Sequence, residues 1–265
     1  MSEHRGHGAV RDAQPEQEIR LAATEAMARN TVWYHTLELP GGVVTPGHID
    51  LRKVAKRLLP HDLRGRRALD VGTFDGFWAF ELERRGAEVV AIDLGAVEES
   101  QIPPNNRELV EREAKQFDVK LGRGFENASE LLRSRASKVV CDVLDLTPEA
   151  IGGPVDVVFL GALLIHLRDP VRALERIHEV LVPGGELYQL EAISLPLTLR
   201  HPRSPVALMQ TLGTGFNWWY PNWATLKTWL MTAGFTDIRG RGLYRPPQRR
   251  PMNDRFCGIH SRRPA

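Results

Sequence analysis

The stretch ALDVGTFDGFWAF, residues 68–80, has the pattern of a buried strand that runs into a tight loop and then a helix. Its first part, within RALDVG (67–72), is apolar enough for a strand covered on both faces. The helix pattern comes next, in DGFWAFELERRG (75–86), with Asp75 placed as its N-cap. Glycine is usual at the middle position of such a nucleotide-binding loop, but this chain has Phe74 there. Whether the loop holds a cofactor therefore depends on the strands and loops further along the chain.

Strand and helix patterns alternate after this loop. Apolar runs predict four more strands, at 87–93, 138–143, 155–161 and 186–194. One intervening helix is expected to begin after Asp169 as its cap and to end at the PGG of 183–185. Apolar strands that alternate with helices are typical of a parallel sheet covered on both faces. We therefore predict an α/β fold: a Rossmann-like, doubly wound, mostly parallel seven-stranded sheet with ligands at the carboxyl ends of the strands.

Two segments stand outside this alternation. Residues 15–55 contain a helix pattern followed by TVWYHTLELPGGVVTPGHID, which predicts a hairpin or loop that caps the site. The stretch 195–222 is too long for an ordinary connection and is expected to form a lid on the substrate side. Residues 1–14 are polar and are expected to be disordered, and 56–265 form the main domain.

The composition excludes several classes of protein. The chain has 35 basic and 33 acidic residues among 265, a net charge of +2 that gives no strong field for binding nucleic acid. Its two cysteines are far apart, which argues against a disulfide framework or a thiolate metal site and fits the cytoplasm. No apolar run or signal peptide indicates membrane insertion or export, and no His, Asp or Glu spacing indicates a metal. The oligomeric state stays open.

Acidic residues mark three successive strand ends. Asp70, Gly72 and Gly76 keep the acid and the outer glycines of the loop, and Asp93 ends the next strand, where it can accept both hydroxyls of a ribose. Asp142 ends the following strand, where an adenine edge would lie. The acids around the loop would repel a pyrophosphate. A nucleoside with a cationic, amino-acid-like end fits better, and S-adenosylmethionine is such a cofactor.

On these residues the chain resembles the class I S-adenosylmethionine-dependent methyltransferases over roughly residues 32–240. The shared motifs are ALDVGTFDG, VVAID, VCDVLDL, VDVVFLGALLIHLRDP and LVPGGEL. A closer resemblance is to the subgroup that includes the bacterial tRNA wobble-uridine carboxymethyltransferase. Its marks are WYHTLELPGGVVTPG, LLIHLRDP and NWWYPNWATLKTWLMTAGFTDIR. Members of that subgroup often lack the middle glycine, so Phe74 is expected to pack beside the cofactor or under the cap.

The resemblance implies roles for further residues around the cofactor. Gly72, Thr73 and Gly76 would line the methionine portion, and Gly161 would offer its carbonyl to the amino group. Asp93 would hold the ribose. The adenine would lie between two neighbouring residues, Asp142 and Val143.

Two departures from the carboxymethyltransferase favour unmodified S-adenosylmethionine. That enzyme has Tyr-His where this chain has Ile165-His166, and the tyrosine helps to recognise the extra carboxylate of its cofactor. Its cofactor-binding lysine falls at or near Val54, between Lys53 and Lys56. Both differences favour simple methyl transfer.

Several residues are candidates for the acceptor side. His166 is the candidate base, with backbone hydrogen bonding as the alternative. His35 and Tyr34 would contact substrate if the N-terminal segment folds over the mouth, or would otherwise pack locally. Glu191 on the last strand before the lid is a candidate pocket acid. The lid itself ends in a polar and aromatic group that forms either a substrate wall or a small core: Trp218, Trp219, Tyr220 and Asn222.

These patterns support three possible functions. The near-neutral charge and aromatic lid favour methyl transfer to a small molecule, at oxygen, in specialised metabolism. Modification of a tRNA wobble uridine is the alternative, and it predicts a continuous basic face and salt-sensitive binding. The third interpretation is a cofactor-binding protein without catalysis, in which replacing His166 would change nothing.

Overall fold

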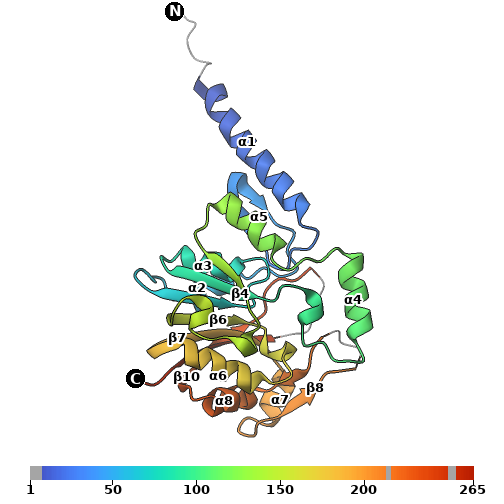
Figure 1. The fold of residues 1–265 in the computed structure, drawn as a ribbon, viewed down its shortest axis with the longest axis vertical. Coiled ribbons are helices and arrows are strands. Elements are labelled where there is room, and N and C mark those ends of the chain that lie inside the picture. Colours follow the sequence, from blue (N-terminus) through green and yellow to red (C-terminus); the bar gives the residue numbers. More distant parts are fainter. Residues whose placement is uncertain (1–7, 213–215, 250–254) are drawn as a thin grey trace, which may run out of the picture.

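The computed structural model describes residues 8–212, 216–249 and 255–265, with side chains from residue 16 onward. The strands of its main sheet follow the order β10-β11-β7-β6-β3-β4-β5 (Figure 1). The β7, β6, β3, β4 and β5 strands run parallel to one another, whereas β11 runs antiparallel to both β7 and β10. The predicted fold, a mostly parallel seven-stranded sheet, is therefore confirmed.

The strands β3, β4 and β6 lie where their apolar runs predict, whereas β5 ends at Val140, before the predicted 143, and β7 begins at Leu181, before the predicted 186. Asp142 therefore lies just after its strand. The bounds of the main-sheet strands are β3 Arg67–Val71, β4 Glu88–Asp93, β5 Ser137–Val140, β6 Val155–Gly161, β7 Leu181–Ile193, β10 Thr236–Tyr244 and β11 Arg255–Arg262. The loops that follow β3, β4, β5, β6 and β7 lie at one edge of the sheet, because parallel strands end on the same side.

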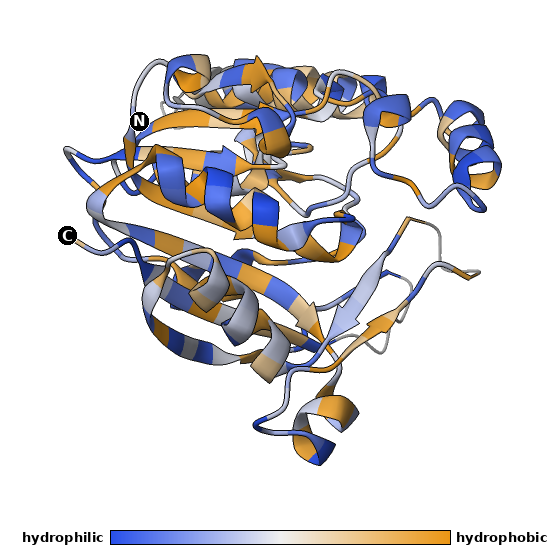
Figure 2. Ribbon diagram, turned by 60° about the horizontal axis from the view of Figure 1, so that its bottom comes forward, coloured by the Kyte–Doolittle hydropathy of each residue, from blue (hydrophilic) through white to orange (hydrophobic). Residues whose placement is uncertain are grey.

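Helices cover both faces of the sheet. The first face packs against α2 (Arg52–Leu58), α3 (Phe77–Glu83) and α5 (Arg123–Leu132), and the second against α6 (Pro170–Val180) and α8 (Trp223–Thr232). Figure 2 shows the hydrophobic colour concentrated along the central strands. Such burial on both faces explains why these strands are near-continuous apolar runs. The remaining main-domain helix, α4 (Arg107–Gln116), buries no residue and lies at the side of the domain.

The N-terminal segment begins with a helix, α1 (Gly8–Arg29), that extends away from the sheet and contacts α5 (Figure 1). The expected disorder is therefore wrong for residues 8–14, and residues 1–7 lie outside the described chain. After α1, the strands β1 (Glu38–Leu39) and β2 (Val43–Val44) pair around the 3-10 turn η1 (Pro40–Gly42). The predicted hairpin is thus present. The expected domain boundary at 55/56 falls inside α2.

Two predicted helix ends are wrong. The helix α3 begins at Phe77 with Gly76 as its N-cap, so Asp75 lies one residue before the cap and does not cap it. The PGG at 183–185 does not terminate α6, which ends at Val180, because these residues lie within β7. Hydrogen bonds between Gly184, Gly185 and Arg263 extend the pairing with the C-terminal segment there. By contrast, Asp169 caps α6 as predicted, by accepting from Arg172 N.

The 195–222 insertion forms a short helix and a separate two-stranded sheet. It consists of α7 (Leu195–Arg200) and the antiparallel pair β8 (Ala207–Met209) and β9 (Trp219–Pro221). The pair lies beside the carboxyl end of the main sheet (Figure 2), where β9 contacts β7. Four further 3-10 turns lie in the described chain: η2 (Val97–Glu99), η3 (Val143–Asp145), η4 (Glu149–Ile151) and η5 (Leu164–His166).

Candidate active site

The loop after β3 is a tight turn held against the end of β4. The amides of Gly72 and Thr73 both donate to Ile92 O, at 2.9 and 3.1 Å. Gly76 has φ of +87°, and a Cβ there would lie 2.4 Å from Phe80, so only glycine fits. Phe74 also adopts a positive φ, 52°, where a side chain costs about 1–2 kcal/mol. Its backbone therefore keeps the conformation that the usual glycine would supply.

The three strand-end acids differ in their surroundings. Asp93 accepts from Phe74 N at 2.7 Å and from Leu94 N at 2.8 Å, which fixes its carboxylate at the loop. Burial raises the pKa of Asp93 above its usual value. Asp142 accepts from Leu144 N through Oδ1, which orients its other oxygen. The adjoining Val143 is buried in the core.

Asp70 is the most deeply buried of the three. Burial is the largest influence on this carboxyl and raises its pKa to about 7. Within the described chain, neither its Oδ2 atom nor the hydroxyl of nearby Thr73 has a hydrogen-bond partner. A buried polar atom without a partner is costly, so this end of the loop suits a ligand that carries donors.

Asp75 binds the N-terminal segment to this loop. Its fully buried carboxylate accepts from Tyr34 N and His35 N, at 2.9 and 2.7 Å, and pairs with His35 Nδ1 at 2.5 Å. The His35 ring also stacks on Phe77, with centroids 5.3 Å apart. His35 is therefore enclosed between the loop and α3. We call this arrangement of Tyr34, His35 and Asp75 the Asp75 clamp.

Tyr34 lies over the loop. Its ring meets Phe74 edge-on, with centroids 5.9 Å apart, and stacks against His48 at 5.8 Å. The expectation that Phe74 packs under the cap is confirmed by this contact. The bulky residue at the middle loop position thus joins the cofactor loop to the N-terminal cover.

The turn after β6 carries His166. This 3-10 turn, η5 (Leu164–His166), comes after Gly161, where a Cβ would lie 3.1 Å from Trp78 Nε1. The His166 ring packs against Phe216 of the insertion, with centroids 4.2 Å apart. Burial lowers the pKa of His166 to about 4, so the imidazole is neutral at physiological pH. Its Nδ1 atom has no hydrogen-bond partner in the described residues.

The insertion is attached to η5 and to the loop after β4. Trp218 N donates to Ile165 O at 2.7 Å, and the Trp218 indole donates to Gln101 O. The Trp219 indole donates to Arg168 O at 3.4 Å. Tyr220 follows Trp219 in β9 and is half-buried. The two indole nitrogens therefore hold the insertion in place instead of pointing into open solvent.

Asn222 and Glu191 are both fully buried, unlike the exposed groups expected of substrate ligands. The Asn222 side chain donates to His201 O and Ser204 O at 2.9 Å and accepts from Val206 N and Thr225 N. It therefore closes the insertion on itself and has no exposed polar atom for a substrate. Glu191 lies beneath η5, where it accepts from Leu164 N at 3.4 Å.

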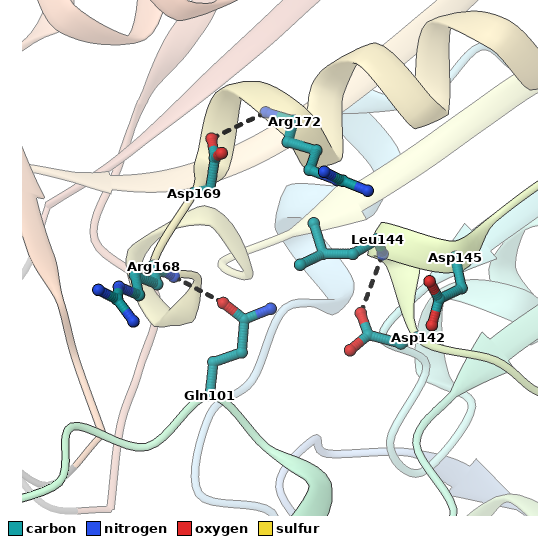
Figure 3. Close-up of a pocket in the computed structure, with 7 residues that line it drawn as sticks. All are labelled: Gln101, Asp142, Leu144, Asp145, Arg168, Asp169 and Arg172. Atoms are coloured by element: carbon teal, nitrogen blue, oxygen red, sulfur yellow. Dashed lines mark hydrogen bonds between the residues drawn. The ribbon is translucent and has the colours of Figure 1, made fainter.

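A pocket of about 590 Å³ opens next to these elements (Figure 3). Its lining consists of Gln101, Asp142, Leu144, Asp145, Arg168, Asp169 and Arg172. Gln101 accepts from Arg168 N at 2.8 Å across the pocket. Of these residues only Asp142 is a predicted cofactor ligand, so the pocket adjoins the expected adenine end of the site.

The structure thus gathers most of the predicted residues at one sheet edge. Residues that sequence patterns missed are the connecting groups, Gln101, Arg168 and the clamp carboxylate Asp75. Gln101 and Arg168 lie in the connections that follow two predicted strands, and Arg168 also lies in the LLIHLRDP motif. In the described ranges, no three His, Cys, Asp or Glu side chains are placed to share a metal ion, and no helix is long and apolar enough to cross a membrane.

A family model described as "Methyltransferase domain" matches residues 48–239, well over half of the chain. The chain belongs to the methyltransferase domain family. The predicted class, a class I S-adenosylmethionine-dependent methyltransferase, is therefore confirmed at the level of family and fold.

Curated relatives of this methyltransferase include the tRNA U34 carboxymethyltransferases. The protein of Azotobacter vinelandii (strain DJ / ATCC BAA-1303) is 30% identical over 189 residues, which are 69% of this chain and 50% of that protein. The protein of Pseudomonas syringae pv. tomato (strain ATCC BAA-871 / DC3000) is 27% identical over 188 residues, with the same coverage. This chain therefore spans about half the length of the curated relatives it matches.

Solved structures share the methyltransferase fold at low identity. The N-terminal domain of EvdMO1, crystallised in the presence of SAH and D-fucose, has a TM-score of 0.58 at 17% identity. The match covers 94% of this chain and 97% of that domain. An S-adenosylmethionine-dependent methyltransferase from Mesorhizobium loti has a TM-score of 0.51 at 15% identity and covers 80% of this chain and 97% of its own.

Proposed function

We propose that this methyltransferase transfers a methyl group from S-adenosylmethionine to an oxygen atom of a small molecule, in specialised metabolism. The observation that carries the proposal is the double cover over the strand ends. The Asp75 clamp holds one cover on the cofactor loop, and Trp218 bonds the other to η5. A site covered from two sides suits an acceptor that can be enclosed and kept from water.

The chain's residues fit the cofactor. Asp93, at the end of β4, is oriented by two backbone amides and would accept the ribose hydroxyls. The unpaired oxygens of Asp70 and Thr73 would meet the cationic amino-acid portion, for which an anionic, donor-poor site is suited. Asp142 and Val143 would contact the adenine, and Gly161 would offer its carbonyl.

His166 is the proposed base. Bound S-adenosylmethionine supplies a methyl group on a sulfonium, a leaving group that is already activated, so the protein mainly aligns the acceptor. The neutral His166 imidazole can accept a hydrogen bond from a substrate hydroxyl. An oxygen that gains a methyl group while still protonated is a much stronger acid than imidazolium. Even a base whose pKa has fallen to about 4 can therefore take that proton.

Apolar side chains on the insertion indicate the acceptor's character. Five of them are exposed among the described residues, although an ordinary soluble surface would carry polar residues there: Leu199, Leu208, Met209, Leu212 and Phe216. Phe216 is 43% exposed while its ring packs on His166, so it borders both the candidate base and solvent. We infer an acceptor with an apolar or aromatic body.

Unmodified S-adenosylmethionine is the proposed cofactor. Val54 is buried in the core, and Ile165 is buried with its carbonyl bonded to Trp218 N. Neither residue offers the charge or hydroxyl that the carboxymethyltransferase uses at these positions.

Calorimetric titration with S-adenosylmethionine and with its carboxylated analogue tests this choice. We expect the unmodified cofactor to bind at least about tenfold more tightly, because the analogue's carboxylate would meet apolar side chains. Equal binding, or preference for the analogue, would reject the proposal. The variant Val54→Lys serves as the matched test, and it should shift the preference toward the analogue.

A second candidate function is modification of a tRNA wobble uridine, the reaction named in the curated relatives. It is favoured by guanidinium groups that gather along one edge of the sheet. Arg239 and Arg241 are both exposed on β10, the strand at that edge of the sheet. Filter binding of tRNA at increasing salt would decide. A steep loss of binding with salt, weakened by Arg241→Ala, would support this function over a small acceptor.

A further inference from the structure

The Glu191 carboxyl is buried at the carboxyl end of β7, directly beneath η5. None of its side-chain surface is exposed, and in the sheet register it lies opposite Cys257 of β11. Its Oε1 atom accepts from Leu164 N at 3.4 Å, the first residue of η5. The Oε2 atom has no hydrogen-bond partner in the described part of the chain. A carboxyl in this position contacts neither solvent nor an open pocket wall.

The turn above Glu191 carries two functional connections. His166 N donates to Leu163 O at 2.9 Å, which closes the turn, and the His166 ring packs on Phe216. Trp218 N donates to Ile165 O at 2.7 Å, which attaches the insertion to the same turn. One carboxyl thus underlies both the candidate base and the attachment of the substrate-side cover.

We propose that Glu191 is a positioning residue that holds η5 so that His166 and the insertion keep the arrangement used for methyl transfer. This inference rests on the proposed function for the use of that arrangement. The geometry of the turn and its dependence on Glu191 can be measured without any acceptor.

The Glu191 carboxyl is neutral because of its surroundings. Burial raises the pKa of Glu191 to about 8, and the only opposing influences are the amides of Leu164 and Leu163. The charged group on β11 at this end of β7 is Arg255, which pairs with Ile193 and is not among the influences on the Glu191 pKa. The other titratable groups on the elements packed here are Cys257 on β11, His166 on η5 and Tyr220 on β9. None supplies a positive charge at neutral pH, since burial raises the pKa of Cys257 to about 12 and lowers that of His166 to about 4.

Ionisation would therefore place an unpaired charge under the turn. A buried carboxylate without a cation or further donors is unfavourable, so η5 would open to let water reach it. The neutral acid avoids the cost of a buried charge and keeps only the smaller cost of one unpaired polar atom, and glutamine matches it in shape and charge. Glu191→Gln keeps a neutral group of the same shape at every pH, whereas Glu191→Ala removes the group. The two variants therefore show whether η5 needs the neutral group and whether the carboxylate form disturbs it.

Hydrogen exchange of the Leu164 and Trp218 amides tests the proposal at about pH 7 and about pH 9.5, corrected for intrinsic exchange rates. We expect protection in the unsubstituted protein to fall about tenfold at the higher pH, and in Glu191→Gln less than about twofold. Glu191→Ala should lose protection at both pH values. The control Glu179→Gln, on the exposed side of α6, should behave like the unsubstituted protein.

Two results would overturn the proposal: the same pH dependence in Glu191→Gln as in the unsubstituted protein, or full protection in Glu191→Ala. If the alanine variant does not fold, the glutamine comparison still decides. Exchange is measured without acceptor, so absence of turnover would count against the proposed function and leave this result standing. With an acceptor, the alkaline fall in kcat should vanish in Glu191→Gln while KM for S-adenosylmethionine is unchanged.

Discussion

The two covers of the site are attached by different kinds of interaction. The N-terminal cover is bound by one fully buried carboxylate, Asp75, which takes three hydrogen bonds from Tyr34 and His35. The insertion is bound by neutral groups, the backbone and indole N–H groups of Trp218, and the Asn222 amide closes it on itself. The N-terminal cover therefore depends on the Asp75 carboxylate inside the cofactor loop. The insertion depends on hydrogen bonds from neutral N–H groups to backbone carbonyls.

This difference separates two roles. The Asp75 clamp is continuous with the loop that would hold the cofactor, so changes there should affect both folding and cofactor binding. The insertion exposes apolar side chains, with Leu212 84% exposed. It is attached to η5 and to the loop after β4, where the Trp218 indole donates to Gln101 O and Asn105 and Asn106 donate to Thr211 O. Changes there should affect the acceptor and leave the cofactor bound.

The largest expected effect is on the clamp. Asp75→Ala should lower the free energy of unfolding by about 3–5 kcal/mol, because it removes the acceptor of three buried hydrogen bonds and leaves backbone donors unsatisfied. Chemical denaturation measures this change. The control is Asp62→Ala, which breaks an exposed pair with Arg64 and should leave the midpoint nearly unchanged. Similar effects at the two positions would contradict the clamp.

The next effect concerns the ribose ligand. Asp93→Ala should weaken S-adenosylmethionine binding about 100-fold or more, because two hydrogen bonds to a charged acceptor are lost. Calorimetric titration gives the dissociation constant. Asp237→Asn on the exposed strand β10 is the control and should bind normally. Unchanged binding by Asp93→Ala would place the cofactor elsewhere.

Within the insertion, Asn222→Ala should lower the free energy of unfolding by about 2–3 kcal/mol, since it leaves several buried backbone groups without partners. Affinity for S-adenosylmethionine should change less than about threefold, because substitutions at separate sites act independently. Asn127→Ala, which removes a single bond to Ala26 O, is the matched control and should cost less. A large loss of cofactor affinity in Asn222→Ala would show that the two covers are not separate.

An acceptor effect is expected on the apolar side of the insertion. Met209→Ser should raise KM for the acceptor about tenfold, because a buried methionine contact contributes roughly 1.5–3 kcal/mol. Cofactor affinity should not change. Met231→Ser, on the exposed side of α8, gives the comparison in steady-state kinetics. If both variants raise KM equally, the insertion is not the acceptor surface.

The smallest effect is a pH dependence of cofactor affinity. Burial raises the pKa of Asp70 to about 7, and the ionised carboxylate attracts the cationic portion of the cofactor more strongly than the neutral acid. Affinity should therefore rise between about pH 6 and about pH 8, by up to about tenfold. Asp70→Asn should bind with the same affinity at both pH values. Calorimetry at the two pH values measures the direction of this change. A fall in cofactor affinity with rising pH would contradict the prediction.

Local patterns were sufficient for much of the fold. The β6 strand has the bounds that its apolar run predicts, because it is buried on both faces and ends in a turn. The Asp169 cap was predictable because its partner, Arg172 N, lies three residues away. The strand-end acids Asp93 and Asp142 were also predictable from position alone, since parallel strands bring their ends together.

Long-range partners were beyond local patterns. The Asp75 side chain has the features of a helix cap, yet its partners lie 40 and 41 residues earlier in the chain. The PGG of β7 resembles a helix end, but bonds to the C-terminal Arg263 draw it into the strand. Asn222 resembles a surface ligand, although it is buried by the insertion's own backbone. In each case a tertiary contact outweighed the local signal.

Transfer of a labelled methyl group tests the central claim most directly. The protein is incubated with methyl-tritiated S-adenosylmethionine and with cell extract divided into a small-molecule fraction and an RNA fraction. We predict that label enters the small-molecule fraction, in a compound extractable into organic solvent, and that Asp93→Ala abolishes the transfer. Label in the RNA fraction, or none in either fraction while the cofactor still binds, would contradict the account.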